Sequence, residues 1–179
     1  MEEQKFIARL LDRKTQNEAF RELMSRYKRP LYNHVRSIVI DHDDANDVLQ
    51  NTFIKVFQYL DKFKGESKLF TWIYRIATNE AITFLKQRAR KSGISNEALQ
   101  SKMVDNLQAD VNYDGDEIAL KLQKAVAILP EKQQLVFKMK YFQELKYEEI
   151  SEILGTSVGA LKASYHHAVK KIEESIKHD

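Results

Sequence analysis

The sequence predicts an all-α protein of two small helical domains joined by an acidic, flexible linker, with a helix-turn-helix as the C-terminal domain. Only five Gly and two Pro occur in its 179 residues, and these are the residues that helix interiors tolerate least. Apolar residues recur at the three- and four-residue intervals of amphipathic helices along most of the chain. Between Ser92 and Glu117 the periodicity weakens and six acidic residues oppose a single Lys, which is typical of a flexible tether. We expect domains over 1–91 and 117–179 and a linker over 92–116.

The composition is that of an ordinary soluble protein, with 43% hydrophobic and 31% charged residues. A net charge of +3 is compatible with nucleic-acid binding. The absence of Cys excludes disulfides and thiolate-bound metals. No apolar run is long enough to span a bilayer, and the polar start at Met1–Lys5 is unlike a signal peptide. We therefore expect a cytoplasmic protein without direct membrane insertion.

Three helices are expected before residue 61. A short first helix ends near Arg13, and a second covers about 18–40, where Pro30 should kink or split it. The third covers about 44–60, and its predicted buried face consists of Ala45, Val48, Leu49, Phe53, Val56, Phe57 and Leu60. A polar helix face is usually only solvated, but an aliphatic residue ringed by polar groups can mark a protein contact. The opposite face of the third helix has this character, with Asp47, Gln50, Asn51 and Ile54.

The loop at 61–68 and the helix expected over 69–91 form a candidate nucleic-acid surface. Projected at 100° per residue, one stripe of this helix lies outside the apolar face, with Trp72 at its upper end. The stripe consists of Arg75, Asn79, Thr83, Lys86 and Arg90. A solvated basic helix end is the simpler interpretation, and side chains that follow a phosphate backbone are the functional one. In the loop, Phe63 between Lys62 and Lys64 is expected to be exposed for base stacking, whereas Phe70 is expected in the core.

The second domain is expected to contain helices over about 116–129, 131–142, 147–154 and 157–176. Gly155 supplies the positive φ of a sharp turn, after which Thr156 or Ser157 can cap the last helix. The core positions of that helix are Val158, Leu161, Tyr165, Ala168 and Ile172. Its other faces are small or polar and suit a DNA major groove. With the cap, the candidate groove residues are Thr156, Ser157, Gly159, Ala160, Lys162, Ala163, His166, His167 and Lys170.

Other classes of protein explain less of the sequence. A stand-alone helix-turn-helix regulator leaves the basic stripe and the aromatic loop of the first half unexplained. A nucleic-acid enzyme would need a catalytic constellation, and the sequence shows no Gly-rich phosphate loop, metal-ligating cluster or nucleophile–His pair. A purely structural helical protein would not need a helix-turn-helix. We expect no enzymatic activity, no catalytic residue, no metal and no cofactor.

The order of these features resembles the bacterial sigma factors of the extracytoplasmic-function (ECF) class. The resemblance rests on Asp47–Phe53, Phe70–Asn79, the basic helix end, Leu129–Gln133 and the helix-turn-helix. It covers about residues 15–91 and 117–176. It implies a transcription initiation factor that binds core RNA polymerase and directs it to promoter DNA, with an anti-sigma factor as a further partner.

The resemblance also implies a role for each candidate surface. The helix bearing Asp47, Gln50, Asn51 and Ile54 would bind the β′ clamp of the polymerase, and part of the second domain would meet the β flap. The 61–68 loop and the basic stripe would recognise and melt the minus-ten element, and the 157–172 helix would enter the major groove of the minus-35 element. The acidic linker would run towards the RNA exit path.

The sequence departs from the family pattern at two places. Asn51 stands where the family often has Glu, which lowers the charge of the expected clamp contact. The segment 162–167 lacks the family's common Ser-Arg pair, so Lys162, His166 or Lys170 would have to make the phosphate contact instead. In the free chain we expect the two domains to contact one another.

Overall fold

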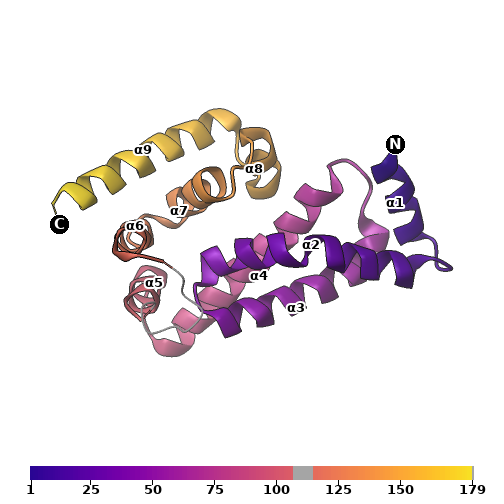
Figure 1. Cartoon of the computed structure of the whole chain (residues 1–179), viewed down its shortest axis with the longest axis horizontal. Coiled ribbons are helices and arrows are strands. Elements are labelled where there is room, and N and C mark those ends of the chain that lie inside the picture. Colours follow the sequence, from indigo (N-terminus) through magenta and orange to yellow (C-terminus); the bar gives the residue numbers. More distant parts are fainter. Residues whose placement is uncertain (107–114, 179) are drawn as a thin grey trace.

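The computed structural model describes residues 1–106 and 115–178, and over these ranges the chain is helical with no strand. The N-terminal domain contains α1 (Glu2–Leu11), α2 (Gln16–Val39), α3 (His42–Tyr59), the 3₁₀ turn η1 (Leu60–Lys62) and α4 (Leu69–Ser92). The C-terminal domain contains α6 (Glu117–Ala127), α7 (Glu131–Phe137), the π-helical turn η3 (Lys138–Phe142), α8 (Tyr147–Leu154) and α9 (Val158–Lys177). Helix α5 (Asn96–Asp105) lies between them in the sequence (Figure 1). The prediction of an all-α, two-domain protein is confirmed.

Helices α2, α3 and α4 pack side by side around the core of the N-terminal domain (Figure 1). Asp41 caps α3, because its side chain accepts a hydrogen bond from the Asp44 amide at 2.9 Å. Helix α2 continues through Pro30 and is not split there. The facing apolar stripes are fully buried and include Leu23, Leu31, Val35, Val48, Val56, Ile73 and Ala77. This packing directs the remaining faces of α3 and α4 outward, where the candidate binding residues lie.

Part of the segment expected to be a flexible linker is a packed helix. In α5, the Ser95 side chain accepts a hydrogen bond from the Ala98 amide at 3.1 Å and so caps the first turn. Leu99 and Val104 are buried. The prediction of a flexible linker is therefore wrong for residues 96–105, while residues 107–114 of that linker lie outside the described residues. The apolar pattern of this segment is too short to predict a helix. The helix is stabilised by apolar partners from distant parts of the chain, which local periodicity does not reveal.

Those partners come from both domains. Val104 packs with Ile40, just after α2, and with Leu120 and Ala127 of α6. Helix α5 lies beside α6 in Figure 1. The helix thus joins the two domains at one end of the molecule.

Helices α8 and α9 form the predicted helix-turn-helix. Gly155 has φ +66°, as the sharp turn requires, and the Ser157 side chain caps α9 by accepting a hydrogen bond from the Ala160 amide at 3.3 Å. Leu161 and Ala168 are fully buried, and Ile172 at the following core position is also buried. Tyr165, also predicted to pack inward, is half-buried and stacks on the Phe137 ring at 5.9 Å.

The two domains contact one another, as expected for the free chain. Helix α8 packs against α4, and one continuous apolar cluster contains Ile73 and Leu85 of α4 together with Leu135, Ile150 and Ile153 of the C-terminal domain. A second cluster belongs to the C-terminal domain alone and consists of Ala125, Val126, Leu129, Phe137, Ala168 and Ile172. We call this packed arrangement of the two domains the closed state.

Candidate nucleic-acid and protein interfaces

The outer face of α3 presents the residues predicted to contact a protein. Asp47, Gln50, Asn51 and Ile54 are all exposed. They point away from α2 and α4 because Val48, Thr52 and Val56 on the opposite side of the same helix are buried. Ile54 retains 49% of its surface in contact with solvent. An aliphatic side chain held in water on a stable helix is a feature of contact surfaces.

The apolar part of this face is larger than the sequence suggested. Phe57 was expected in the core, but 42% of its surface is exposed. Its ring packs edge-on against Phe20, at 5.0 Å between centroids. The prediction of burial is therefore wrong for Phe57, because position 57 lies at the boundary of the apolar stripe and not inside it. With Ile54 it forms an exposed apolar pair one helical turn apart.

The 61–68 loop differs from the prediction at its aromatic residue. Phe63 is 7% exposed, and its ring packs on the half-buried Trp72 at 5.0 Å between centroids. The expectation of an exposed Phe63 is wrong, because the chain leaves η1 in an extended conformation that turns this ring towards α4. Lys62 and Lys64 on either side are exposed, and the Lys62 ammonium lies 4.9 Å from the centre of the Tyr59 ring. The loop therefore presents two exposed ammonium groups next to a packed pair of aromatic rings.

The polar stripe of α4 is a continuous exposed surface. Arg75, Asn79, Thr83, Lys86 and Arg90 are all exposed. Between them Ala77, Ala81, Leu85 and Ala89 turn inward and are buried. The stripe begins beside the 61–68 loop and runs to the last turn of α4, where Gly93 with φ +68° ends the helix. Cations at this end also interact favourably with the helix dipole.

Helix α9 exposes the small and basic residues predicted to face DNA. Gly159, Ala160, Lys162 and Ala163 are exposed near its start, and His166, His167 and Lys170 are exposed further on. Ser157 is exposed, and Thr156 is half-buried in the turn. The Lys162 ammonium lies 5.7 Å from the centre of the Tyr147 ring of α8. Sequence reasoning missed this ring, which lies next to the candidate groove residues.

The two candidate DNA surfaces share a cleft in the closed state. A cleft of about 650 Å³ is lined on one side by the 62–67 loop residues with Trp72 and Arg75, and on the other by Glu152, Thr156 and Ser157. A neighbouring cleft of about 400 Å³ lies between Arg75 and Asn79 of α4 and Ile153, Leu154 and Thr156. The structure therefore brings together residues that were predicted to belong to two separate surfaces. Glu152 adds a carboxylate opposite the basic loop, which no pattern in the sequence indicated.

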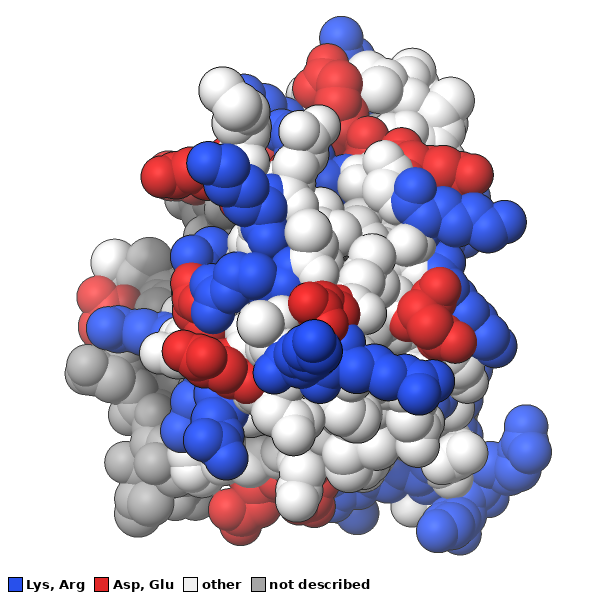
Figure 2. Space-filling view, turned by 90° about the vertical axis from the view of Figure 1, so that its right-hand side faces the viewer, with Lys and Arg blue, Asp and Glu red and all other residues white. Residues whose placement is uncertain are grey.

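Charge on the molecular surface is mixed. Figure 2, which views the molecule from the side of α1, shows Lys and Arg side chains interspersed with Asp and Glu. With a net charge of +3, a strong field of one sign over the whole molecule is not expected. Binding to DNA would therefore depend on the local surfaces of α4, the 61–68 loop and α9.

Comparison with known proteins matches the two domains separately. The family described as Sigma-70 region 2 matches residues 23–91, and the family described as Sigma-70, region 4 matches residues 119–172. The chain is 30% identical over 191 residues to the ECF RNA polymerase sigma-E factor of Haemophilus influenzae, with 98% of each chain covered. The chain belongs to the ECF class of RNA polymerase sigma factors. A further relative of this sigma factor is the ECF RNA polymerase sigma factor SigW of Bacillus subtilis, at 27% identity over 92% of each chain.

Solved structures show that the fold is shared. The sigma factor RpoE from Bartonella quintana, in complex with the anti-sigma factor NepR, matches with a TM-score of 0.66 at 21% identity, over 89% of this chain and 98% of that one. CnrH in complex with the cytosolic domain of CnrY matches with a TM-score of 0.68 at 20% identity, over 99% and 98%.

Membership of this family makes the protein a promoter-directing transcription initiation factor. The two matched regions of this sigma factor coincide with α2–α4 and with α6–α9. Among the described residues, no helix combines the length and the apolar character that crossing a membrane requires.

Proposed function

We propose that the exposed surfaces divide the work of promoter-directed initiation between the two domains. Core RNA polymerase binds the outer face of α3, with the β′ clamp against Asp47, Gln50, Asn51 and Ile54. The observation that supports this assignment most strongly is the exposed Ile54–Phe57 pair, because apolar side chains at the centre of a polar patch contribute most to protein interfaces. The β flap meets the C-terminal domain. The protein works in the cytoplasm, together with the polymerase.

The minus-ten element binds the N-terminal domain along α4 and the 61–68 loop. Lys86 and Arg90 contact phosphates, while Asn79 and Thr83 offer hydrogen bonds to bases. Lys62 and Lys64 neutralise the opened strand beside Trp72, whose half-buried ring can stack on a base. Because Phe63 supports Trp72 from below, its role is to position that ring.

The minus-35 element binds the start of α9. Gly159, Ala160 and Ala163 allow the helix to approach the base edges, and Thr156 and Ser157 contact the backbone at its N-terminus. Lys162, His166, His167 and Lys170 supply the longer contacts. A neutral His can donate or accept a hydrogen bond, so His167 can read a base or a phosphate.

The two promoter elements cannot be read at the same time while the protein is in the closed state. They are named for positions that differ by about 25 base pairs, roughly 85 Å along the duplex axis. In the closed state the two reading surfaces line one cleft of about 650 Å³, which equals the volume of roughly 20 water molecules. The domains therefore separate when the protein joins the polymerase on a promoter.

An anti-sigma factor is the proposed regulator of this sigma factor. Among the solved structures that share the fold, RpoE is bound to the anti-sigma factor NepR, and CnrH is bound to the cytosolic domain of CnrY. The exposed apolar pair on α3 is the surface for which a partner of this kind and the polymerase would compete.

Run-off transcription tests the proposal directly. Purified core RNA polymerase is incubated with the protein and a library of promoter fragments, and the transcripts are sequenced. Initiation at defined sites that depends on the protein is the expected result. DNA binding without polymerase binding or initiation would contradict it and would favour a conventional helix-turn-helix regulator.

A further inference from the structure

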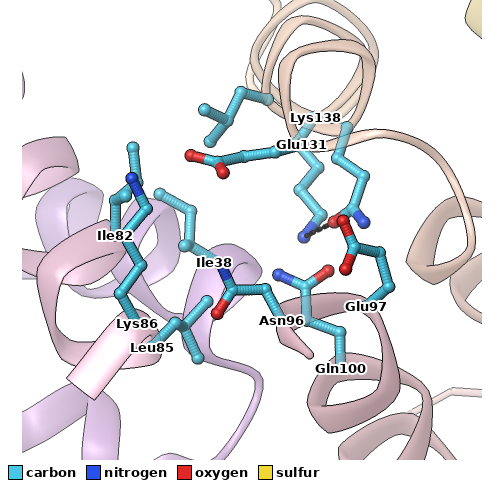
Figure 3. A pocket seen from close by; sticks show the side chains of 11 residues that line it. Ile38, Ile82, Leu85, Lys86, Asn96, Glu97, Gln100, Glu131 and Lys138 are labelled. Atoms are coloured by element: carbon cyan, nitrogen blue, oxygen red, sulfur yellow. Dashed lines mark hydrogen bonds between the residues drawn. The ribbon is translucent and has the colours of Figure 1, made fainter. Parts of the chain in front are cut away.

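A charged side chain is buried where the two domains meet. Lys138 of η3 is 3% exposed and lines a cavity with Ile38 of α2, Leu85 of α4 and Gln100 of α5. Figure 3 shows these side chains converging from the N-terminal domain, α5 and the C-terminal domain. The Lys138 ammonium therefore lies inside the closed interface and not within either domain alone.

The ammonium is poorly compensated there. Its Nζ donates one hydrogen bond, to Gln134 Oε1 at 3.4 Å, and no carboxylate among the described residues lies within 4.0 Å of it. Burial lowers the pKa of Lys138 to about 8. Removing an ion from water without a counter-ion opposes the closing of the interface.

Polar groups around Lys138 are also incompletely paired. His34 of α2 is buried and bonds Thr78 Oγ1 through Nε2 at 2.7 Å, but its Nδ1 has no partner among the described residues. The Gln143 side chain lies beside His34 and interacts with it, but neither its oxygen nor its nitrogen makes a hydrogen bond of standard length and angle within the described chain. Such groups return to water when the domains part, which favours separation.

The backbone is strained where α2 ends, next to α5 and α6. Ile40 has φ +69° and ψ −47°, and the Asp41 amide bonds the Val39 carbonyl at 2.8 Å across it. This tight γ-turn is unfavourable for a β-branched residue. Ile40 packs on Val104 and Leu120, so contacts with α5 and α6 add to the hydrogen bonds with Arg36 that hold the strained turn.

We propose that Lys138 destabilises the closed state and so favours separation of the domains. Its charge is buried when the domains are together and returns to water when they separate. The apolar contacts of α4 with α7 and α8 close the interface, and the buried ammonium keeps it weak enough to open. The benefit for DNA reading rests on the proposed function, but the effect of Lys138 on closure does not.

Closing of the domains lowers the affinity of Lys138 for its proton. With an ordinary pKa of 10.5 in the open state and about 8 in the closed state, closing releases a proton between these values. The ratio of closed to open molecules therefore rises with pH from about 8 to 10.5 and does not change with pH below that range, where Lys138 is charged in both states. A neutral side chain at position 138 would raise the ratio at pH 7 by roughly 300-fold.

Other titratable groups near Lys138 do not produce this rise. The cavity is also lined by Lys86 of α4, Glu97 of α5 and Glu131 of α7. On the far side lie His34, with a pKa lowered to about 4 by burial, and Tyr74, with a pKa raised by burial. Lys86 is the remaining group, and it is tested separately.

The test measures closure without DNA or polymerase, so its result is independent of the proposed function. Because the chain has no Cys, Glu18→Cys in α2 and Glu173→Cys in α9 provide two exposed labelling sites, one in each domain. Single-molecule energy transfer then counts closed and open molecules. From pH 7 to 9.5 the closed-to-open ratio should rise roughly 25-fold, and Lys138→Met should raise it at pH 7 and remove the pH response.

Lys86→Met is the matched control, because it removes the other ammonium on the same cavity and should leave the pH response intact. Lys138→Gln, which is neutral but polar, takes the place of Lys138→Met if that variant does not fold. A ratio that stays flat with pH in the parent chain, or neutral variants at position 138 that leave the ratio unchanged or lower it, would overturn the proposal.

Discussion

Arg75 of α4 and Thr156 of the helix-turn-helix line the same two clefts. One lies in the stripe proposed to read the minus-ten element and the other at the start of the surface proposed to read the minus-35 element. Two side chains that are distant in sequence and would be distant on a promoter are therefore neighbours in the free chain. In the closed state the two proposed DNA surfaces face one another across these clefts, so the proposed reading of both elements requires the domains to separate.

The first prediction concerns the basic end of α4. The double variant Lys86→Ala/Arg90→Ala should weaken promoter binding by the polymerase complex for every sequence, because phosphate contacts carry no sequence information. The slope of log affinity against log salt should become shallower by about one for each phosphate that is no longer neutralised. Binding measured at several salt concentrations gives this slope, and Lys102→Ala/Lys124→Ala, at two Lys outside the stripe, is the control. An unchanged slope would remove Lys86 and Arg90 from the interface.

A second prediction concerns base reading by α9. Lys162→Ala and His167→Ala should each change which minus-35 sequences are preferred, because both side chains are exposed on the helix proposed to enter the groove. Removing a side chain that reads a base should reduce discrimination by about 1–3 kcal/mol. Selection from a randomised upstream element measures the preference, and affinity for core polymerase should stay the same. Equal preference before and after both substitutions would contradict the assignment.

The third prediction separates polymerase binding from DNA reading. Ile54→Ser should lower affinity for core polymerase by about 1–2 kcal/mol, or roughly 5- to 30-fold, because it removes exposed apolar area from the proposed contact. Folding should be unaffected, since Ile54 is already exposed to water. Lys102→Ser, at an exposed position of α5, is the control in the binding titration. Loss of minus-ten preference with normal polymerase affinity would show that Ile54 lies on a DNA-reading surface instead.

A fourth prediction concerns acid stability. Burial lowers the pKa of His34 to about 4 from its usual 6.5, so the unfolded chain takes up this proton first as the pH falls. The free energy of unfolding is at its full value above about pH 6.5 and falls progressively down to about pH 4, by about 2 kcal/mol between pH 7 and pH 5. Urea denaturation at these two pH values measures the decrease. His34→Gln should show a smaller decrease over the same interval, and an equal decrease in both chains would contradict the role of His34.

Helical periodicity was sufficient to predict most of the fold. The ends of α4, α8 and α9 were close to their observed positions, because Gly93 and Gly155 supply turns that only a few residues can make. The exposure of the α4 stripe and of the α9 groove residues also followed from periodicity. These are local properties, since each depends on residues within a few turns of the chain.

The remaining features depend on interactions between distant residues. Phe63 is buried because Trp72 lies across from it, and α5 forms because Val104 finds partners on both domains. Neither interaction has a signature at the spacing of a helix or a turn. Lys138 is visible in the sequence as the single cation within the otherwise apolar segment Leu135–Met139. Only the packed domains show why that position matters.

Separation of the domains on a promoter can be measured as the distance between them with and without core polymerase. Labels at Glu18→Cys and Glu173→Cys report this distance in the free chain and in the transcribing complex. We predict a longer distance in the complex than in the free chain, as the wide spacing of the two promoter elements requires. A complex that initiates transcription at the defined sites while the distance remains that of the closed state would contradict domain separation.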